Sequence, residues 1–277
     1  MRQDDYPPRL RSHADWVGSH PSTVTTSDHR AASIRVLVAT LARKARQFVH
    51  AYQSDRSART IIYVIVAVNC CLIGIDIFLK FMSYFGHYHY HPDFQVTVEG
   101  GYPELFNYLQ LTVVAWLMLH VFVRTRQAVY AASGIIFLIA LAEDALGLHE
   151  RVGVYAAEID IPAPSLLGAP HFAELLHFLV VGALFIVLLV YGLAASSAED
   201  RKIGALFTLL IFILGFFVAV VDAVHIMLIG VFAGSHFLLG VIEDGGEMLT
   251  VAVALSAALL LFRHLDDLRR PSRSVPK

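Results

Sequence analysis

Acidic and histidine side chains recur within and beside four apolar stretches of the sequence, where charged groups are costly. In chain order they are Glu143, Asp144, His149 and Glu150, then His171, Glu174 and His177, then Asp222 and His225, and finally His236, Glu243, Asp244 and Glu247. An ionisable side chain inside a membrane segment is expensive to bury, and by default it marks a functional site. Carboxylates together with imidazoles can bind a metal ion, transfer protons or form a hydrogen-bonded polar core.

Helical spacing groups these residues further. Residues three or four apart lie on one face of a helix, and three pairs meet this condition: Glu174 with His177, Asp222 with His225, and Glu243 with Glu247. Glu143 and Glu150, seven apart, are also expected on one face. Known di-metal carboxylate bundles take a single Glu from each of two helices and Glu-x-x-His from each of the other two. Glu174-x-x-His177 fits that motif, and Asp222-x-x-His225 is a shorter relative of it.

The pattern therefore predicts a site for one or two divalent transition-metal ions. Oxygen and imidazole ligands favour Fe, Mn or Zn over Cu(I). The expected ligands are Glu143, Glu150, Glu174, His177, Asp222, His225, Glu243 and Glu247, with Asp144, His149, His171, Asp244 and His236 as supporting or additional candidates. Three other interpretations stay open: a polar core without metal, a proton or ion path, and a haem site.

The composition places these residues in a membrane. The chain of 277 residues is 57% hydrophobic and only 16% charged, whereas about 25% of the residues of a soluble domain are charged. Six apolar runs, at 60–80, 104–123, 128–147, 171–193, 203–230 and 239–262, meet the roughly 17–25 residues that a membrane-crossing helix needs. The prediction is an all-α bundle of six transmembrane helices.

Basic residues predict the orientation. They gather before the first run and in every second connection after it: Arg124 and Arg126, Arg201 and Lys202, and Arg263, Arg269, Arg270, Arg273 and Lys277. Such connections stay in the cytoplasm, so both termini are expected there, in a bacterial-type inner membrane. Five parts of the set then fall roughly 5–15 Å below the outer surface at about 1.5 Å per residue: Glu143, Glu174, His177, Asp222 and 243–247.

The remaining segments divide the chain into four parts. Residues 1–32 are polar and are predicted to be a disordered cytoplasmic tail. Residues 33–58 mix apolar and basic residues, which is typical of a helix lying on an anionic membrane surface, although a solvated lead-in to the first span fits as well. Residues 59–263 form the transmembrane domain, and residues 264–277 form a basic cytoplasmic tail.

Several polar residues outside the main set are weaker candidates for a role at the site. The loop at 81–103 carries His87, His89 and His91, which would share one side of an extended strand and could capture a metal, although loops of this kind are often rich in His without binding one. Asp76 lies near the outer end of the first span, and Asn107 lies near the start of the second. Both could support the site or line its entry.

Two motifs carry a resemblance. Glu143-Asp144 followed by His149-Glu150, and Glu243-Asp244-Gly245-Gly246-Glu247-Met248, resemble a family of uncharacterised bacterial multi-span membrane proteins. The acidic pair expected there as Asp-Glu is Glu-Asp in this chain. The similarity covers spans three to six, and it implies a shared site without implying an activity.

Three classes of function remain. The first is a metalloenzyme that acts on a lipid or a small hydrophobic molecule, with metal-activated water or O2. The second is a transporter of protons or a divalent cation. A transporter must be reachable from both faces of the membrane, and the apolar inner halves of the helices argue against that. The third is a non-enzymatic assembly subunit, as a homo-oligomer or in a membrane complex. The sequence contains no HExxH, GxSxG or P-loop motif, and no nucleotide cofactor or nucleic-acid partner is expected.

The topology is testable with reporter fusions. Fusions after residues 126, 202 and 265 should report a cytoplasmic location, and fusions near 92, 160 and 234 the opposite side, because basic connections are retained in the cytoplasm. One reversed signal in either set would contradict the six-span topology and the common depth of the acids and histidines.

Overall fold

The computed structural model describes residues 26–86, 91–98, 100–159, 168–228 and 235–269, and every regular element within these ranges is helical. The chain forms two units, residues 1–39 and 40–277. Helix α1 (Thr26–Ser54) begins in the first unit and continues into the second. It starts earlier than the predicted amphipathic segment. The predicted tail at 1–25, with His87, His89 and residues 270–277, lies outside the described residues.

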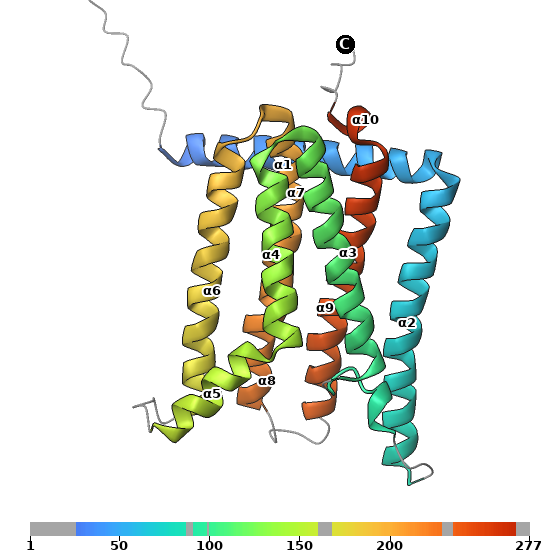
Figure 1. Ribbon diagram of the computed structural model, residues 1–277, viewed down its shortest axis with the longest axis vertical. Coiled ribbons are helices and arrows are strands. Elements are labelled where there is room, and N and C mark those ends of the chain that lie inside the picture. The colour runs from blue at the N-terminus through green and yellow to red at the C-terminus, as the bar shows by residue number, and fades with distance from the viewer. Residues whose placement is uncertain (1–25, 87–90, 99, 160–167, 229–234, 270–277) are drawn as a thin grey trace, which may run out of the picture. The chain divides into compact units, whose positions relative to one another are not determined.

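Six helical stretches of the second unit are long and apolar enough to cross a membrane. They are α2 (Arg56–Tyr84), α3 (Tyr102–Thr125), α4 (Ala128–Ala145), α6 (Gly168–Ala194), the continuous run of α7 (Ala198–Gly215), η2 (Phe216–Val221) and α8 (Asp222–Leu228), and α9 (Ser235–Arg263). Short helices η1 (Pro92–Phe94), α5 (Leu148–Glu158) and α10 (Leu265–Arg269) complete the described elements (Figure 1). The predicted all-α fold with six membrane helices is confirmed.

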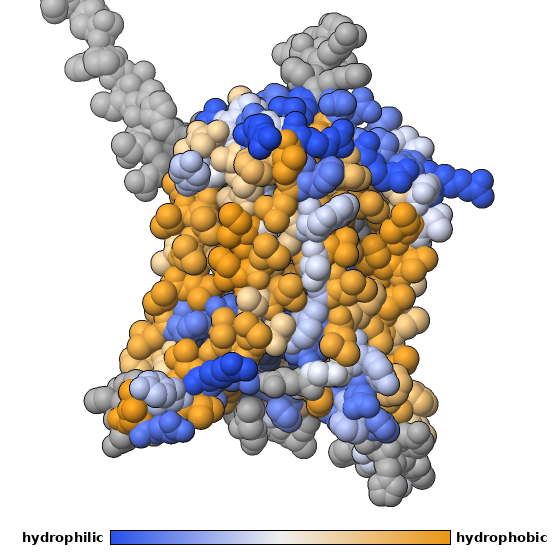
Figure 2. Space-filling model, viewed as in Figure 1, coloured by the Kyte–Doolittle hydropathy of each residue, from blue (hydrophilic) through white to orange (hydrophobic). Residues whose placement is uncertain are grey.

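Helix α9 lies at the centre of this bundle. It packs against α2, α3, α7, η2 and α8, and it is the most buried of the six candidate spans, whereas α2 and α6 are the least buried. Hydrophobic residues cover the middle of the helices, and hydrophilic ones gather near their ends (Figure 2). The exposed apolar faces of α2 and α6 are therefore the surfaces that lipid would cover.

The chain turns sharply between α4 and α5. Helix α4 ends at Ala145, Gly147 adopts a left-handed backbone with φ 54°, and α5 begins at Leu148. Glycine tolerates that conformation without steric cost. The expectation that Glu143 and Glu150 share one helix face is therefore wrong, because the turn places them on two different helices.

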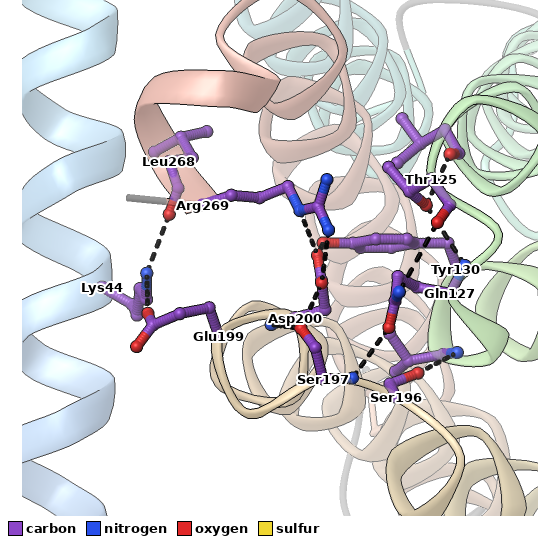
Figure 3. A network of polar contacts seen from close by, with 12 residues as sticks. Lys44, Thr125, Gln127, Tyr130, Ser196, Ser197, Glu199, Asp200, Leu268 and Arg269 are labelled. Atoms are coloured by element: carbon purple, nitrogen blue, oxygen red, sulfur yellow. Dashed lines mark hydrogen bonds and ion pairs between the residues drawn. The ribbon is translucent and has the colours of Figure 1, made fainter. Parts of the chain in front are cut away.

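The ends of α3, α6 and α9 and the starts of α4 and α7 meet at one end of the bundle, which we call the basic end (Figure 1). Its main cluster of polar contacts is drawn in Figure 3. Asp200 is fully buried; its carboxylate accepts a hydrogen bond from the Tyr130 hydroxyl at 2.7 Å and pairs with the Arg269 guanidinium at 2.9 Å. These contacts join α4, α7 and α10.

Lys44 of α1 extends the same cluster. Its ammonium is buried, donates to the carbonyl oxygen of Leu268 at 2.8 Å and lies 3.1 Å from the Glu199 carboxylate (Figure 3). A buried ammonium needs such partners because desolvation is costly. Part of the predicted basic tail is therefore a short helix, α10, held against α1 and α7.

Asp55 joins the first and the last membrane helices, α2 and α9, where α2 begins and α9 ends. It caps α2 by accepting from the Ala58 backbone N–H, and it also binds Arg263 and His264. The Ala58 hydrogen bond, followed by the Arg263 guanidinium, lowers the pKa of Asp55 to about 2. Since the ordinary value is about 4, the ionised carboxylate favours the folded chain above that pH, and this contribution is lost as the pH falls towards 2.

Replacing Asp200 should test the basic-end cluster. Asp200→Ala should lower the free energy of unfolding by roughly 3 kcal/mol, because it leaves the buried Tyr130 hydroxyl unpaired and removes the Arg269 counter-charge. Thermal or denaturant unfolding in detergent measures the loss. The exposed Asp266→Ala control should change stability by no more than about 0.5 kcal/mol. Equal effects in the two variants would contradict a stabilising role for this cluster.

Candidate functional site

The predicted acids and histidines occupy the opposite end of the bundle, where α4 ends, α5 lies, and α6 and α9 begin (Figure 1). We call this set the acidic layer. It comprises Glu143 and Asp144 of α4, His149 and Glu150 of α5, His171, Glu174 and His177 of α6, Asp222 and His225 of α8, and His236, Glu243, Asp244 and Glu247 of α9. All thirteen lie within the described residues, so five helices contribute to one region.

The first pair of the layer joins α4 to α6. The Nε2 atom of His177 lies 2.7 Å from an oxygen of Glu143, and both side chains are mostly shielded from solvent. Glu174, which the sequence paired with His177, is instead 3.0 Å from Nδ1 of His171. The Glu-x-x-His spacing is present, but its two members have different hydrogen-bond partners.

A second group joins α8 to α9. The imidazole of His225 is buried; its Nδ1 lies 2.7 Å from a Glu243 oxygen and its Nε2 lies 2.9 Å from Nδ1 of His236. The carboxyl of Asp222 is also within hydrogen-bonding reach of Glu243. Asp222, Glu243, His225 and His236 therefore form one continuous chain of polar contacts.

Electrostatic proximity links the two groups. The charged neighbours of Asp222 include Glu174 and His149 as well as His225. Glu247 has Asp144 and Asp222 among its own neighbours. Helices α4, α5, α6, α8 and α9 therefore bring ionisable side chains close enough to influence one another electrostatically.

The backbone just before Asp222 departs from a regular α-helix. Residues Phe216–Val221 form the π-helical segment η2, and such segments occur often at functional sites. A Cβ atom on Gly246 would lie 2.3 Å from the Phe217 ring, so the glycine allows η2 to pack directly on α9. The sequence signal for this contact is the Gly245-Gly246 pair; the π-helical turn itself was not predicted.

The first span also reaches the acidic layer. Asp76 of α2 is fully buried and lies 3.0 Å from the Lys80 ammonium. Both are electrostatic neighbours of Asp244, and Lys80 also lies 5.3 Å from the centre of the Phe237 ring. Asp76 was a candidate from the sequence, whereas Lys80 was not predicted, although their spacing of four residues was a visible signal.

The carboxylates and imidazoles of the acidic layer are the side-chain types that bind divalent metals. Their positions in this structure do not form a metal site. Across the ranges that the structure describes, no group of three or more His, Cys, Asp or Glu side chains is arranged to hold a metal ion. The Nδ1 atom of His149 is buried and has no hydrogen-bond partner in the described part of the chain, which is unusual for such an atom. Of the three loop histidines, only His91 is described, and it lies 3.4 Å from Asp93.

A cleft leads from the surface to this region. Its volume is about 590 Å³, and it is lined by Glu150, Val154, Ala157 and Glu158 of α5 and by Pro170 and Glu174 of α6. A Cβ atom on Gly153 would lie 2.3 Å from a Glu174 oxygen. The glycine therefore lets the Glu174 carboxyl lie against the α5 backbone.

Comparison with known proteins adds a family and no activity. Residues 89–262 match the family described as a domain of unknown function, DUF8692. The match includes α3 to α8 and nearly all of α9, hence every helix of the acidic layer, and excludes α1 and α2. No curated protein and no solved structure matches the chain. The match spans well over half of the sequence, so this multi-pass membrane protein belongs to the DUF8692 family.

Proposed function

We propose that the chain is a membrane metalloenzyme that binds a divalent transition metal, Fe, Mn or Zn, in the acidic layer and acts on a lipid or another small hydrophobic molecule. One observation carries the proposal: five helices bring carboxylates and imidazoles together at one end, and three of the imidazoles are held by carboxylates. These pairs are His177 with Glu143, His171 with Glu174, and His225 with Glu243.

Histidine–carboxylate pairs support this proposal because a ligating histidine almost always donates its other ring N–H to a carboxylate or carbonyl, which fixes the direction of the ring. His177 uses Nε2 for Glu143, which would leave Nδ1 to face a metal. His225 engages both ring nitrogens. Metal binding by His225 would therefore require it to exchange the contact with His236 or with Glu243.

The chemistry follows from the setting of the layer. A divalent metal at this position would activate water or O2, or polarise an oxygen of the substrate. The chain would hold that group in an apolar membrane domain, supply Asp222, Glu174 and Glu247 as further oxygen donors, and admit a substrate through the cleft beside Glu174. Oxygen and imidazole donors suit Fe, Mn or Zn, as one ion or two.

A second candidate function is transport of protons or a divalent cation. It is favoured by buried polar side chains outside the acidic layer, in parts of the helices that the sequence predicted to be apolar. Asn69 and Gln110 form a buried amide pair between α2 and α3 at 3.0 Å, Ser133 is buried in α4, and Asp200 is buried at the basic end. These groups lie on different helices and at different positions along them, and they do not form a continuous polar path. This favours the metalloenzyme over a transporter.

For orientation, we propose that the basic end faces the cytoplasm of a bacterial-type cell and that the acidic layer opens to the outer side of the inner membrane. The basic side chains at the ends of α3 and α9 and at the start of α7 support this orientation, because positively charged connections stay inside. Membrane lipids are then the principal partners, and an assembly role with other subunits stays a prediction.

Metal content tests the function directly. Wild-type protein, full-length and purified in detergent, should contain a stoichiometric divalent transition metal by elemental analysis. The single changes Glu174→Ala, His177→Ala, Asp222→Ala and His225→Ala should each remove most of it, because they are predicted to share one centre, and their effects should be strongly non-additive. A triple change of His87, His89 and His91 to Ala should leave the final content unchanged.

Other outcomes separate the alternatives. If the acidic layer is only a hydrogen-bonded core, the wild type folds without metal and each change costs roughly 1–3 kcal/mol of stability. Folded wild type without stoichiometric metal would refute the metalloenzyme. Metal retained in both Glu174→Ala and Asp222→Ala would place the site elsewhere.

The contact between η2 and α9 provides a test of positioning. Gly246→Ala should push the Phe217 ring away from α9 and move Asp222 relative to Glu243, because the added Cβ would lie 2.3 Å from that ring. We expect weaker metal binding and a stability loss of about 1–3 kcal/mol. Gly182→Ala, where nothing lies within 4 Å of the new Cβ, is the matched control. Wild-type metal affinity in Gly246→Ala would rule out this positioning role.

A further inference from the structure

Two hollows adjoin each other on the surface of α5. The larger is the cleft of about 590 Å³ that ends at Glu174. The smaller, of about 330 Å³, is lined by Glu150, Arg151, Val154, Tyr155 and Glu158. Because Glu150, Val154 and Glu158 line both, the two hollows form one surface, which we call the α5 cleft. Both hollows have volumes within the roughly 300–1,000 Å³ typical of small-ligand sites.

Opposite charges lie side by side in the α5 cleft. Among the described residues, the larger hollow carries the carboxylates of Glu150, Glu158 and Glu174 and no basic side chain. The smaller hollow adds the guanidinium of Arg151 and the phenol of Tyr155. A guanidinium binds phosphate with matching geometry, and carboxylates attract an ammonium group. The arrangement suits a ligand that carries a phosphate and an ammonium close together.

The cleft borders the acidic layer through Glu174, which belongs to both. The Nδ1 atom of His149, on the first turn of α5, is buried and has no hydrogen-bond partner among the residues that the structure describes, but His149 does not line the cleft. Glu174 is also an electrostatic neighbour of Asp222. A ligand in the α5 cleft would therefore meet the acidic layer at Glu174.

The surroundings of the cleft favour a lipid as the source of that ligand. Val152, Val154 and Tyr155 of α5, and Ile159 directly after it, are all exposed. A short helix with exposed apolar side chains beside charged ones is typical of one that lies in the membrane interface. Acyl chains would cover these side chains, whereas a soluble ligand would leave them in water.

We propose that the α5 cleft binds the head group of a zwitterionic phospholipid, with its phosphate on Arg151 and its ammonium on Glu150 and Glu158. This inference rests on the proposed function, because it names the substrate class that the acidic layer would act on. The binding itself requires no metal, so it can be measured independently of metal content.

Native mass spectrometry of the full-length protein in detergent can measure this binding. The probes are short-chain phosphatidylethanolamine, the matched phosphatidylglycerol, and free phosphoethanolamine. We expect the wild type to bind phosphatidylethanolamine roughly tenfold more tightly than phosphatidylglycerol, a difference of about 1.4 kcal/mol. Free phosphoethanolamine should bind much more weakly, because it lacks the chains that cover α5.

Two substitutions test the ammonium contact and the phosphate contact of the head group separately. Glu158→Gln should weaken phosphatidylethanolamine binding and leave phosphatidylglycerol unchanged, because it alters only the ammonium contact. Arg151→Gln should weaken both lipids by a similar factor, because both carry the phosphate. The exposed residues Arg201 and Asp266, at the basic end, provide matched controls as Arg201→Gln and Asp266→Asn, which should bind like the wild type.

The outcomes distinguish this inference from the proposed function. Equal binding of both lipids, unaffected by Glu158→Gln and Arg151→Gln, would overturn the head-group site and show only general lipid association. Free phosphoethanolamine bound as tightly as the lipid would overturn the lipid as ligand. Metal content is measured in the same samples: selective lipid binding by metal-free wild type would support the cleft and refute the metalloenzyme, whereas metal without lipid selectivity would do the reverse.

Discussion

The cost of burying charge in an apolar bundle shapes this structure more than any other constraint. A buried ionisable group must find a partner, since its desolvation is otherwise uncompensated. At the basic end, Asp200 is satisfied by Tyr130 and Arg269. In the acidic layer, His225 contacts Glu243. Each of these contacts joins different helices, so satisfying the charges also sets which helices lie together and at which depth.

The two ends meet that constraint with different chemistry. The basic end pairs acids with the permanent cations of Arg and Lys, which hold their charge at any ordinary pH. The acidic layer combines eight carboxylates with five histidines, and the Lys80 ammonium of α2 lies near it. Lys44 and Asp200 therefore suit a fixed framework. His177 and His225, each held by a carboxylate of another helix, suit groups that would exchange partners when a cation binds.

The sequence predicted those properties that depend on local composition. Span number and the common depth of Glu143, Glu174, Asp222 and Glu243 follow from apolar run lengths and helical rise. Individual partners depend on helix rotation and on backbone irregularities, which spacing does not encode. Gly147 places Glu150 on another helix, and the π-helical segment η2 interrupts the regular α-helix directly before Asp222. The contact between Tyr130 and Asp200 was missed because each residue looks like an ordinary helix-end group in the sequence.

The pairing within the acidic layer also limits how any ligand can bind there. A cation that enters must replace contacts already made, such as that of His225 with Glu243 at 2.7 Å. Its net affinity is therefore the difference between new coordination and the lost internal hydrogen bonds, each worth roughly 1–3 kcal/mol when a charged group takes part. Lys80 adds to this competition, because its ammonium already lies beside Asp76 and near Asp244. A monovalent cation would gain less from several carboxylates than a divalent ion, so these contacts disfavour monovalent cations more strongly.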